Sequence, residues 1–130
     1  MKYLLLSFIF VSVSSWAHDL NFKNYLQMQD SLAKDDFKAA LASHATICTK
    51  DLVHNMDDYK DCKASFKNIE QLRESFKSLS TLFIENGDKK GLKNLMVAEC
   101  PMAKAKWIQE KGSIRNPYYG KSMLQCGQKI

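Results

Sequence analysis

Two pairs of sulfur-bearing residues lie near the C-terminus of this 130-residue chain. Cys100 and Met102 form the first pair, and Met123 and Cys126 form the second. Thiolate and thioether sulfurs are soft ligands that suit Cu(I) or Ag(I), and they suit Mg²⁺ or Ca²⁺ poorly. Turns rich in Pro and Gly between the pairs could bring the two ends together. The spacing therefore indicates a candidate low-coordinate metal site made of these four residues.

A disulfide between Cys100 and Cys126 is the alternative, with Met102 and Met123 as core filler. It would close a loop of about 26 residues and add on the order of 3 kcal/mol to a small domain. The chain has four cysteines, and an even number in an exported chain is typical of disulfides. The spacing favours Cys48 with Cys62 and Cys100 with Cys126. From spacing alone, the disulfide is preferred to the metal site.

Two histidines offer further candidate ligands. His44 and Cys48 are four residues apart, so on a helix they project from the same face. They could hold a metal, although a core histidine beside a buried thiol is the preferred interpretation. His18 would become the N-terminal residue if the chain were cleaved after Ala17. A terminal amine and the imidazole of the same residue can chelate divalent copper, and a shift of the cleavage point by one residue would abolish that site.

The first residues predict export. Lys2 precedes an apolar run from Leu4 to Val13, and Ser15-Trp16-Ala17 places small residues at the cleavage positions, as in a signal peptide covering 1–17. The run is too short for a transmembrane span of about 20 residues, although an uncleaved anchor is the alternative. We therefore expect a periplasmic or secreted protein. No membrane span is expected after cleavage.

The remaining residues, 18–130, are enough for one small domain. The formal net charge is +5, but basic and acidic residues alternate without a long run of one sign. This pattern is typical of a solvated surface, so we expect no nucleic-acid partner.

Apolar periodicity predicts the scaffold. Helices are expected from Asn21, after an N-cap at Asp35 or Asp36, and from Asp61 to Glu85, where Gly87 would act as a left-handed C-cap. Leu95 to Ala98 is expected to form a strand or extended segment, with Trp107 and Ile108 pairing with it as a two-strand ribbon. The predicted fold class is mainly α: a helical bundle of three to four helices with a small irregular or two-stranded C-terminal lobe at 100–127.

The tail also carries several short motifs in a fixed order. They are Cys100-Pro101-Met102-Ala103, Trp107, Asn116-Pro117-Tyr118-Tyr119-Gly120 and Met123-Leu124-Gln125-Cys126-Gly127. Together they resemble the signature of a bacterial family of uncharacterised exported domains. That family occurs as standalone proteins and as the C-terminal domain of CusB-like copper/silver efflux adaptors. Upstream, Tyr25-Leu26, Asp35-Asp36 and the segment from Arg73 to Ser80 resemble its helical motifs.

The resemblance implies a helical bundle with a sulfur-rich tail, in a family linked by context to copper or silver handling. Carried over to this chain, the candidate metal ligands are Cys100, Met102, Met123 and Cys126, with His54 as a fifth. Cys48 and Cys62 are not part of the motif, which favours a separate structural disulfide for them.

The sequence thus predicts a periplasmic Cu(I)- or Ag(I)-binding protein that passes its metal to a heavy-metal efflux complex. The alternative is a disulfide-stabilised periplasmic interaction module without metal. An enzyme is the weakest interpretation, because the chain has no nucleophile elbow, phosphate-binding loop, His-Glu-x-x-His helix or redox CxxC motif. We therefore expect no catalytic residues.

Overall fold

The computed structural model describes residues 20–53 and 57–130. Its helices are α1 (Phe22–Ala33), α2 (Phe37–Thr46), α3 (Ile69–Asn86) and α4 (Lys89–Leu92). Its strands are β1 (Leu95–Cys100), β2 (Ala105–Glu110) and β3 (Gln128–Lys129). A π-helical turn at Ile47–Asp51 extends α2, and 3₁₀ turns lie at Lys60–Lys63 and Gly120–Met123.

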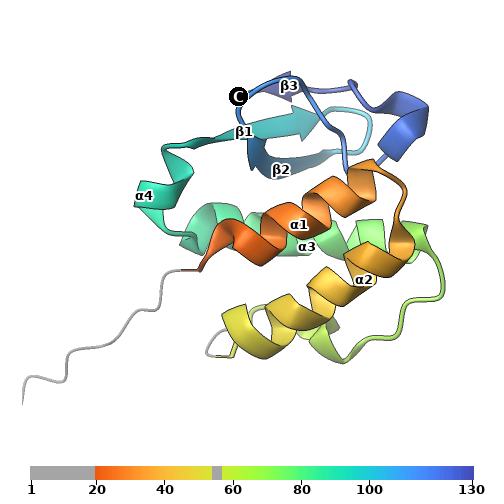
Figure 1. Cartoon of the computed structure of the whole chain (residues 1–130), viewed down its shortest axis with the longest axis vertical. Coiled ribbons are helices and arrows are strands. Elements are labelled where there is room, and N and C mark those ends of the chain that lie inside the picture. The colour runs from red at the N-terminus through yellow and green to blue at the C-terminus, as the bar shows by residue number, and fades with distance from the viewer. Residues whose placement is uncertain (1–19, 54–56) are drawn as a thin grey trace, which may run out of the picture.

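The elements form layers (Figure 1). The three strands make an antiparallel sheet in the order β2-β1-β3. Helices α1 and α3 lie along one side of the sheet, and α2 packs on α1 away from the strands (Figure 1). Trp107 and Ile108 are successive residues of β2 and point to opposite faces, yet both are 0% exposed. Both faces of β2 are therefore covered.

The prediction of a mainly α fold was wrong, because the described residues form an α+β structure. The predicted strand pairing is present, with Val97 opposite Ile108 and Ala98 opposite Trp107. The missed strand, β3, consists of two exposed polar residues that pair with Ala98 and Glu99. A polar segment of this length shows no alternation of apolar and polar residues, so the sequence does not reveal it as a strand. It becomes a strand only through its pairing with β1.

Helix α3 begins at Ile69, later than the predicted Asp61. Its N-terminus is a reciprocal cap: the Asn68 side chain accepts from the Gln71 N–H at 2.9 Å, and the Gln71 side chain accepts from the Lys67 N–H at 2.8 Å. Such a reciprocal cap gives hydrogen-bond acceptors to N–H groups that have no partner inside the helix. Side chains also cap α1, α2 and α4, at Asn21, Asp36 and Asp88.

The predicted left-handed conformation at Gly87 was also wrong, because Gly87 is extended, with φ −71° and ψ 158°. Glycine is required there for a different reason. A Cβ atom on Gly87 would collide with the Phe22 ring and the Phe83 carbonyl oxygen. Gly120, by contrast, has a φ of +58°, and a Cβ there would collide with Asp35 and Arg73.

Two tyrosine hydroxyl groups occupy the outer edge of β2. The Ile108 N–H donates to the Tyr25 hydroxyl at 3.0 Å, and the Tyr118 hydroxyl donates to the Lys106 carbonyl oxygen. Both hydroxyl groups also bond to Ser80 of α3. This edge is therefore bonded to α1, α3 and the tail instead of being open to another strand.

The Arg73 guanidinium joins the helices to the tail. It donates to the Pro117 carbonyl oxygen at 2.8 Å, the Leu32 carbonyl oxygen at 2.8 Å and the Asp35 carboxylate at 2.6 Å. The Arg73 side chain is only 10% exposed. The hydrogen bond from Arg73 is the largest factor that holds the pKa of Asp35 below its usual range. One buried cation thus connects α3, the end of α1 and the C-terminal segment.

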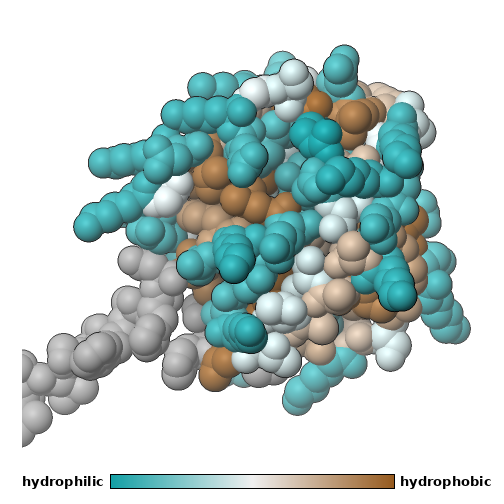
Figure 2. Space-filling model, viewed as in Figure 1, coloured by the Kyte–Doolittle hydropathy of each residue, from teal (hydrophilic) through white to brown (hydrophobic). Residues whose placement is uncertain are grey.

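Polar side chains cover most of the face seen in Figure 2, where an apolar area is exposed between them. Within the described parts of the chain, no helix combines the length and apolar character that a bilayer span needs.

Replacing Arg73 with Met tests this connection. The change leaves two buried carbonyl oxygens without their donor, so we expect a loss of about 2–4 kcal/mol in the free energy of unfolding. Urea denaturation measures it as a lower midpoint at an unchanged slope. Lys77→Met on the same helix is the control and should cost less than about 0.5 kcal/mol. Equal stability of the two variants would show that the Arg73 bonds contribute little.

Candidate functional site

Two free thiols meet where β1 ends and the tail turns into β3. Cys100 is the last residue of β1 and is 1% exposed, and Cys126 is half-buried. Their sulfur atoms are 4.0 Å apart. Strand β3 determines this approach, because Gln128 pairs with Glu99 and so returns the tail beside the end of β1. The Cys100 sulfur also accepts the Ala103 N–H at 3.4 Å.

A buried asparagine holds the second thiol in place. The Asn116 side chain is 0% exposed, and its amide nitrogen donates to the Cys126 carbonyl oxygen at 2.6 Å. Its carbonyl oxygen accepts the N–H groups of Tyr118 and Tyr119 at 2.8 and 3.1 Å. One side chain therefore fixes both the turn at 116–120 and the backbone of Cys126.

The two candidate thioethers occupy different environments. Met123 is half-buried in the 3₁₀ turn, and its carbonyl oxygen accepts the Cys126 N–H at 3.1 Å. Met102 lies in the turn between β1 and β2 and is 62% exposed. Met123 is thus part of the same turn as Cys126, whereas Met102 projects into solvent next to Cys100.

The proximity of the thiols affects their protonation. Partial burial, the hydrogen bond with Cys100 and the charge on Cys100 together raise the pKa of the Cys126 thiol. Two thiolates side by side repel each other, and a bound cation would remove that repulsion. Among the described residues, no three His, Cys, Asp or Glu side chains come together in a metal-binding arrangement.

The predicted Cys48–Cys62 disulfide is confirmed, with Cα atoms 5.5 Å apart. It joins the π-helical turn after α2 to the 3₁₀ turn before α3, and not to α3 itself as predicted. Cross-linking residues 14 positions apart stabilises a small domain by about 3 kcal/mol. Because Cys48 is bridged, the pair of His44 and Cys48 is a core histidine beside a disulfide.

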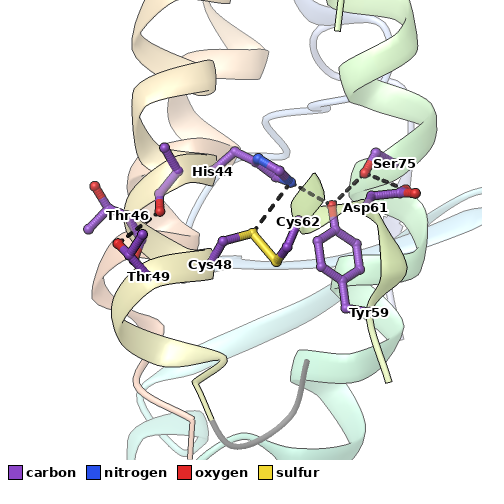
Figure 3. Close-up of a disulfide and its surroundings, with 9 residues drawn as sticks. His44, Thr46, Cys48, Thr49, Tyr59, Asp61, Cys62 and Ser75 are labelled. Atoms are coloured by element: carbon purple, nitrogen blue, oxygen red, sulfur yellow. Dashed lines mark hydrogen bonds between the residues drawn. A yellow bond between two sulfur atoms is a disulfide. The ribbon is translucent and has the colours of Figure 1, made fainter. Parts of the chain in front are cut away.

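His44 begins a buried chain of hydrogen bonds beside that disulfide (Figure 3). Its Nε2 lies 2.9 Å from the Tyr59 hydroxyl, which also bonds to the Ser75 hydroxyl. Ser75 in turn donates to Asp61 at 2.7 Å. Donors and acceptors match when Nε2 carries a proton and donates to Tyr59, as in the neutral imidazole. Burial lowers the pKa of His44, and the charge on Asp61 opposes this effect.

Two predicted ligands lie outside the described residues: His54, and His18 with the signal segment 1–17. Of the others, the structure brings the sulfurs of Cys100 and Cys126 together and leaves Met102 exposed.

The sequence did not indicate that Arg73 and Asn116 support the thiol site. It also did not indicate the Tyr59–Ser75–Asp61 cluster, which lies beside the Cys48–Cys62 disulfide. A signal for Arg73 existed, because it follows Leu72 in the most regular apolar stripe of the chain. Nothing in the residue type of Asn116 indicates that its side chain bonds to the Cys126 carbonyl oxygen.

Comparison with known proteins identified no relative of this chain. No protein-family model, no curated protein and no solved structure matches this chain. The resemblance of the tail to the exported domain family therefore stays a prediction.

The His44 cluster predicts a pH dependence of stability. The pKa of His44 is lowered by folding, so below its usual value of about 6.5 the unfolded chain binds more protons than the folded one. The stability that His44 contributes is therefore complete above about pH 6.5 and falls as the pH drops toward the folded pKa. In His44→Gln this fall should be smaller, as measured by urea denaturation from pH 7.5 to 4.5. Parallel curves for the two proteins would contradict the assignment.

Proposed function

We propose that this protein binds Cu(I) or Ag(I) through Cys100 and Cys126 and releases it by ligand exchange, without chemistry on an organic substrate. The observation that carries the proposal is the pair of reduced thiols with sulfurs 4.0 Å apart. In the same chain the other two cysteines are bridged. A soft monovalent cation is the cargo that suits two thiolates and a thioether.

The separation of the sulfurs leaves room for a third ligand. If each metal–sulfur bond is about 2.3 Å, as thiolate bonds to Zn²⁺ are, sulfurs 4.0 Å apart subtend an angle of about 120° at the ion. An angle of this size suits trigonal coordination, whereas two-coordinate linear binding needs a wider separation. Met123 is our candidate for the third ligand, because its backbone closes the same turn as Cys126. Met102 would approach from the solvent side.

The thiol environment supports metal binding in two further ways. The Ala103 N–H bonded to the Cys100 sulfur holds that sulfur in place at the end of β1. The raised pKa of Cys126 keeps that thiol protonated without metal, so binding releases a proton and the affinity for the metal rises with pH.

The resemblance of the tail supports placing the protein in copper or silver homeostasis. On this proposal the chain is exported by the signal segment 1–17 and delivers its metal to a heavy-metal efflux complex. His54 and His18 remain candidate additional ligands.

A disulfide-stabilised module without metal is the second candidate. The observation that favours it is the same short distance, because sulfurs 4.0 Å apart need only a small movement to form a bond of about 2.05 Å. In an oxidising compartment such a bond would persist. Oxidation and metal binding use the same two sulfurs, so they exclude each other.

Anaerobic titration of reduced protein against a coloured Cu(I) chelator tests the metal proposal. We expect the protein to take about one equivalent of Cu(I) from the chelator through soft ligands. Cys100→Ser or Cys126→Ser should abolish this uptake. Met123→Leu should weaken binding by about tenfold, or 1.4 kcal/mol, because it removes one sulfur and keeps the apolar volume.

The control is Cys48→Ala with Cys62→Ala, which removes the two bridged sulfurs away from the thiol pair. This variant should keep the one-equivalent stoichiometry, provided it is folded by circular dichroism. Full binding by Cys100→Ser, or loss of binding only in the control, would contradict the proposal.

A further inference from the structure

A groove of about 480 Å³ opens beside the thiol pair, and Cys100 is part of its lining. One wall is the face of α3 that carries Lys77, Thr81 and Ile84. The other wall is the end of the β1–β2 hairpin, from Glu99 to Lys106. This volume lies within the range of about 300–1,000 Å³ that small-molecule sites span. It suits a ligand of tripeptide size.

Charged groups of both signs line the groove together with apolar residues. Three lysines line it, at 77, 104 and 106, together with Glu85 and Glu99. Within the described residues, Lys104 and Lys106 form no ion pair, and Lys77 pairs with Glu74 outside the groove at 2.8 Å. Lys106 stands opposite Glu99 in the strand register. With three lysines and two carboxylates, the lining has an excess of one positive charge.

We propose that this groove binds a small zwitterionic thiol that carries Cu(I), with two carboxylates and one ammonium group, and positions its metal next to Cys100. The lysines would receive the carboxylates, and Glu85 or Glu99 the ammonium group. The inference rests on the proposed function, because it concerns how the metal reaches the thiol pair.

The transfer is a ligand exchange in which no atom changes oxidation state. The Cys100 sulfur forms a bond to Cu(I) as the bond between Cu(I) and the carrier sulfur breaks. The proton of the Cys100 thiol goes to the departing carrier thiolate, which leaves as a free thiol. The Cys126 sulfur then adds to the same Cu(I) as its second protein ligand and gives its proton to solvent. No metal–sulfur bond breaks in this second step, and no oxidant or reductant is needed.

Charge reversal in the groove tests the proposal. The variant Lys104→Glu with Lys106→Glu is compared with Lys38→Glu and Lys63→Glu, which changes the net charge equally at exposed positions on α2 and on the 3₁₀ turn at 60–63. Rapid mixing under anaerobic conditions measures Cu(I) uptake from two donors, the anionic glutathione complex and the cationic acetonitrile complex. We expect the groove variant to take up Cu(I) from the glutathione complex roughly tenfold more slowly than the wild type. Its uptake from the acetonitrile complex should be no slower than that of the wild type.

The control variant should take up Cu(I) from both donors at nearly the wild-type rate. Equal slowing of the two variants with glutathione would overturn the groove assignment, because net charge alone would explain it. A wild-type rate in the groove variant would also overturn it.

A second measurement separates this inference from the proposed function. S-methylglutathione has no free thiol, and we expect it to shift the backbone NMR signals of Thr81 and Lys104 in the metal-free protein. If these shifts appear but no donor delivers Cu(I), the proposed function fails while the groove still binds the zwitterion. If Cu(I) is bound normally and no shifts appear, the groove assignment fails alone.

Discussion

The buried guanidinium of Arg73 is the constraint on which the arrangement of this protein depends. It reaches the end of α1 through the Leu32 carbonyl oxygen and the tail through the Pro117 carbonyl oxygen. A neutral side chain of this length could not supply several donors in a planar fork. Asp35 provides the balancing charge from a left-handed backbone conformation, with a φ of 59°. The helices and the C-terminal segment therefore have one shared anchor.

The segment held by Arg73 leads directly to the candidate site. Pro117 follows Asn116, whose side chain bonds to the backbone of Cys126. The return of the chain as β3 beside β1 then fixes Cys126 next to Cys100. The position of the Cys126 thiol therefore depends on contacts with helix α3, with the buried Asn116 and with strand β1. The distance between the sulfurs is set by tertiary structure and not by local turns alone. The Cys48–Cys62 disulfide stabilises the other end of the molecule.

Local patterns in the sequence predicted a large part of this structure. The apolar stripe of α3, an N-cap at one of the two predicted aspartates, the pairing of Trp107 and Ile108 with the segment 95–98 and the Cys48–Cys62 bridge are all present. Predictions failed where a residue depends on distant partners. Gly87 is needed because Phe22 crosses it, and β3 forms only because β1 offers a free edge. For the site, spacing indicated which sulfurs could meet, but the roles of Arg73 and Asn116 depend on contacts that no local pattern encodes.

The central claim is that Cys100 and Cys126 are a reduced pair available for a soft metal, while Cys48 and Cys62 are bridged. Intact mass of the processed protein, purified without reductant and denatured in the presence of an alkylating agent, tests it most directly. The account predicts two alkyl groups on each chain, located by peptide mapping on Cys100 and Cys126, and four after prior reduction. No alkylation before reduction would contradict the claim, because the tail would then be held by a second disulfide.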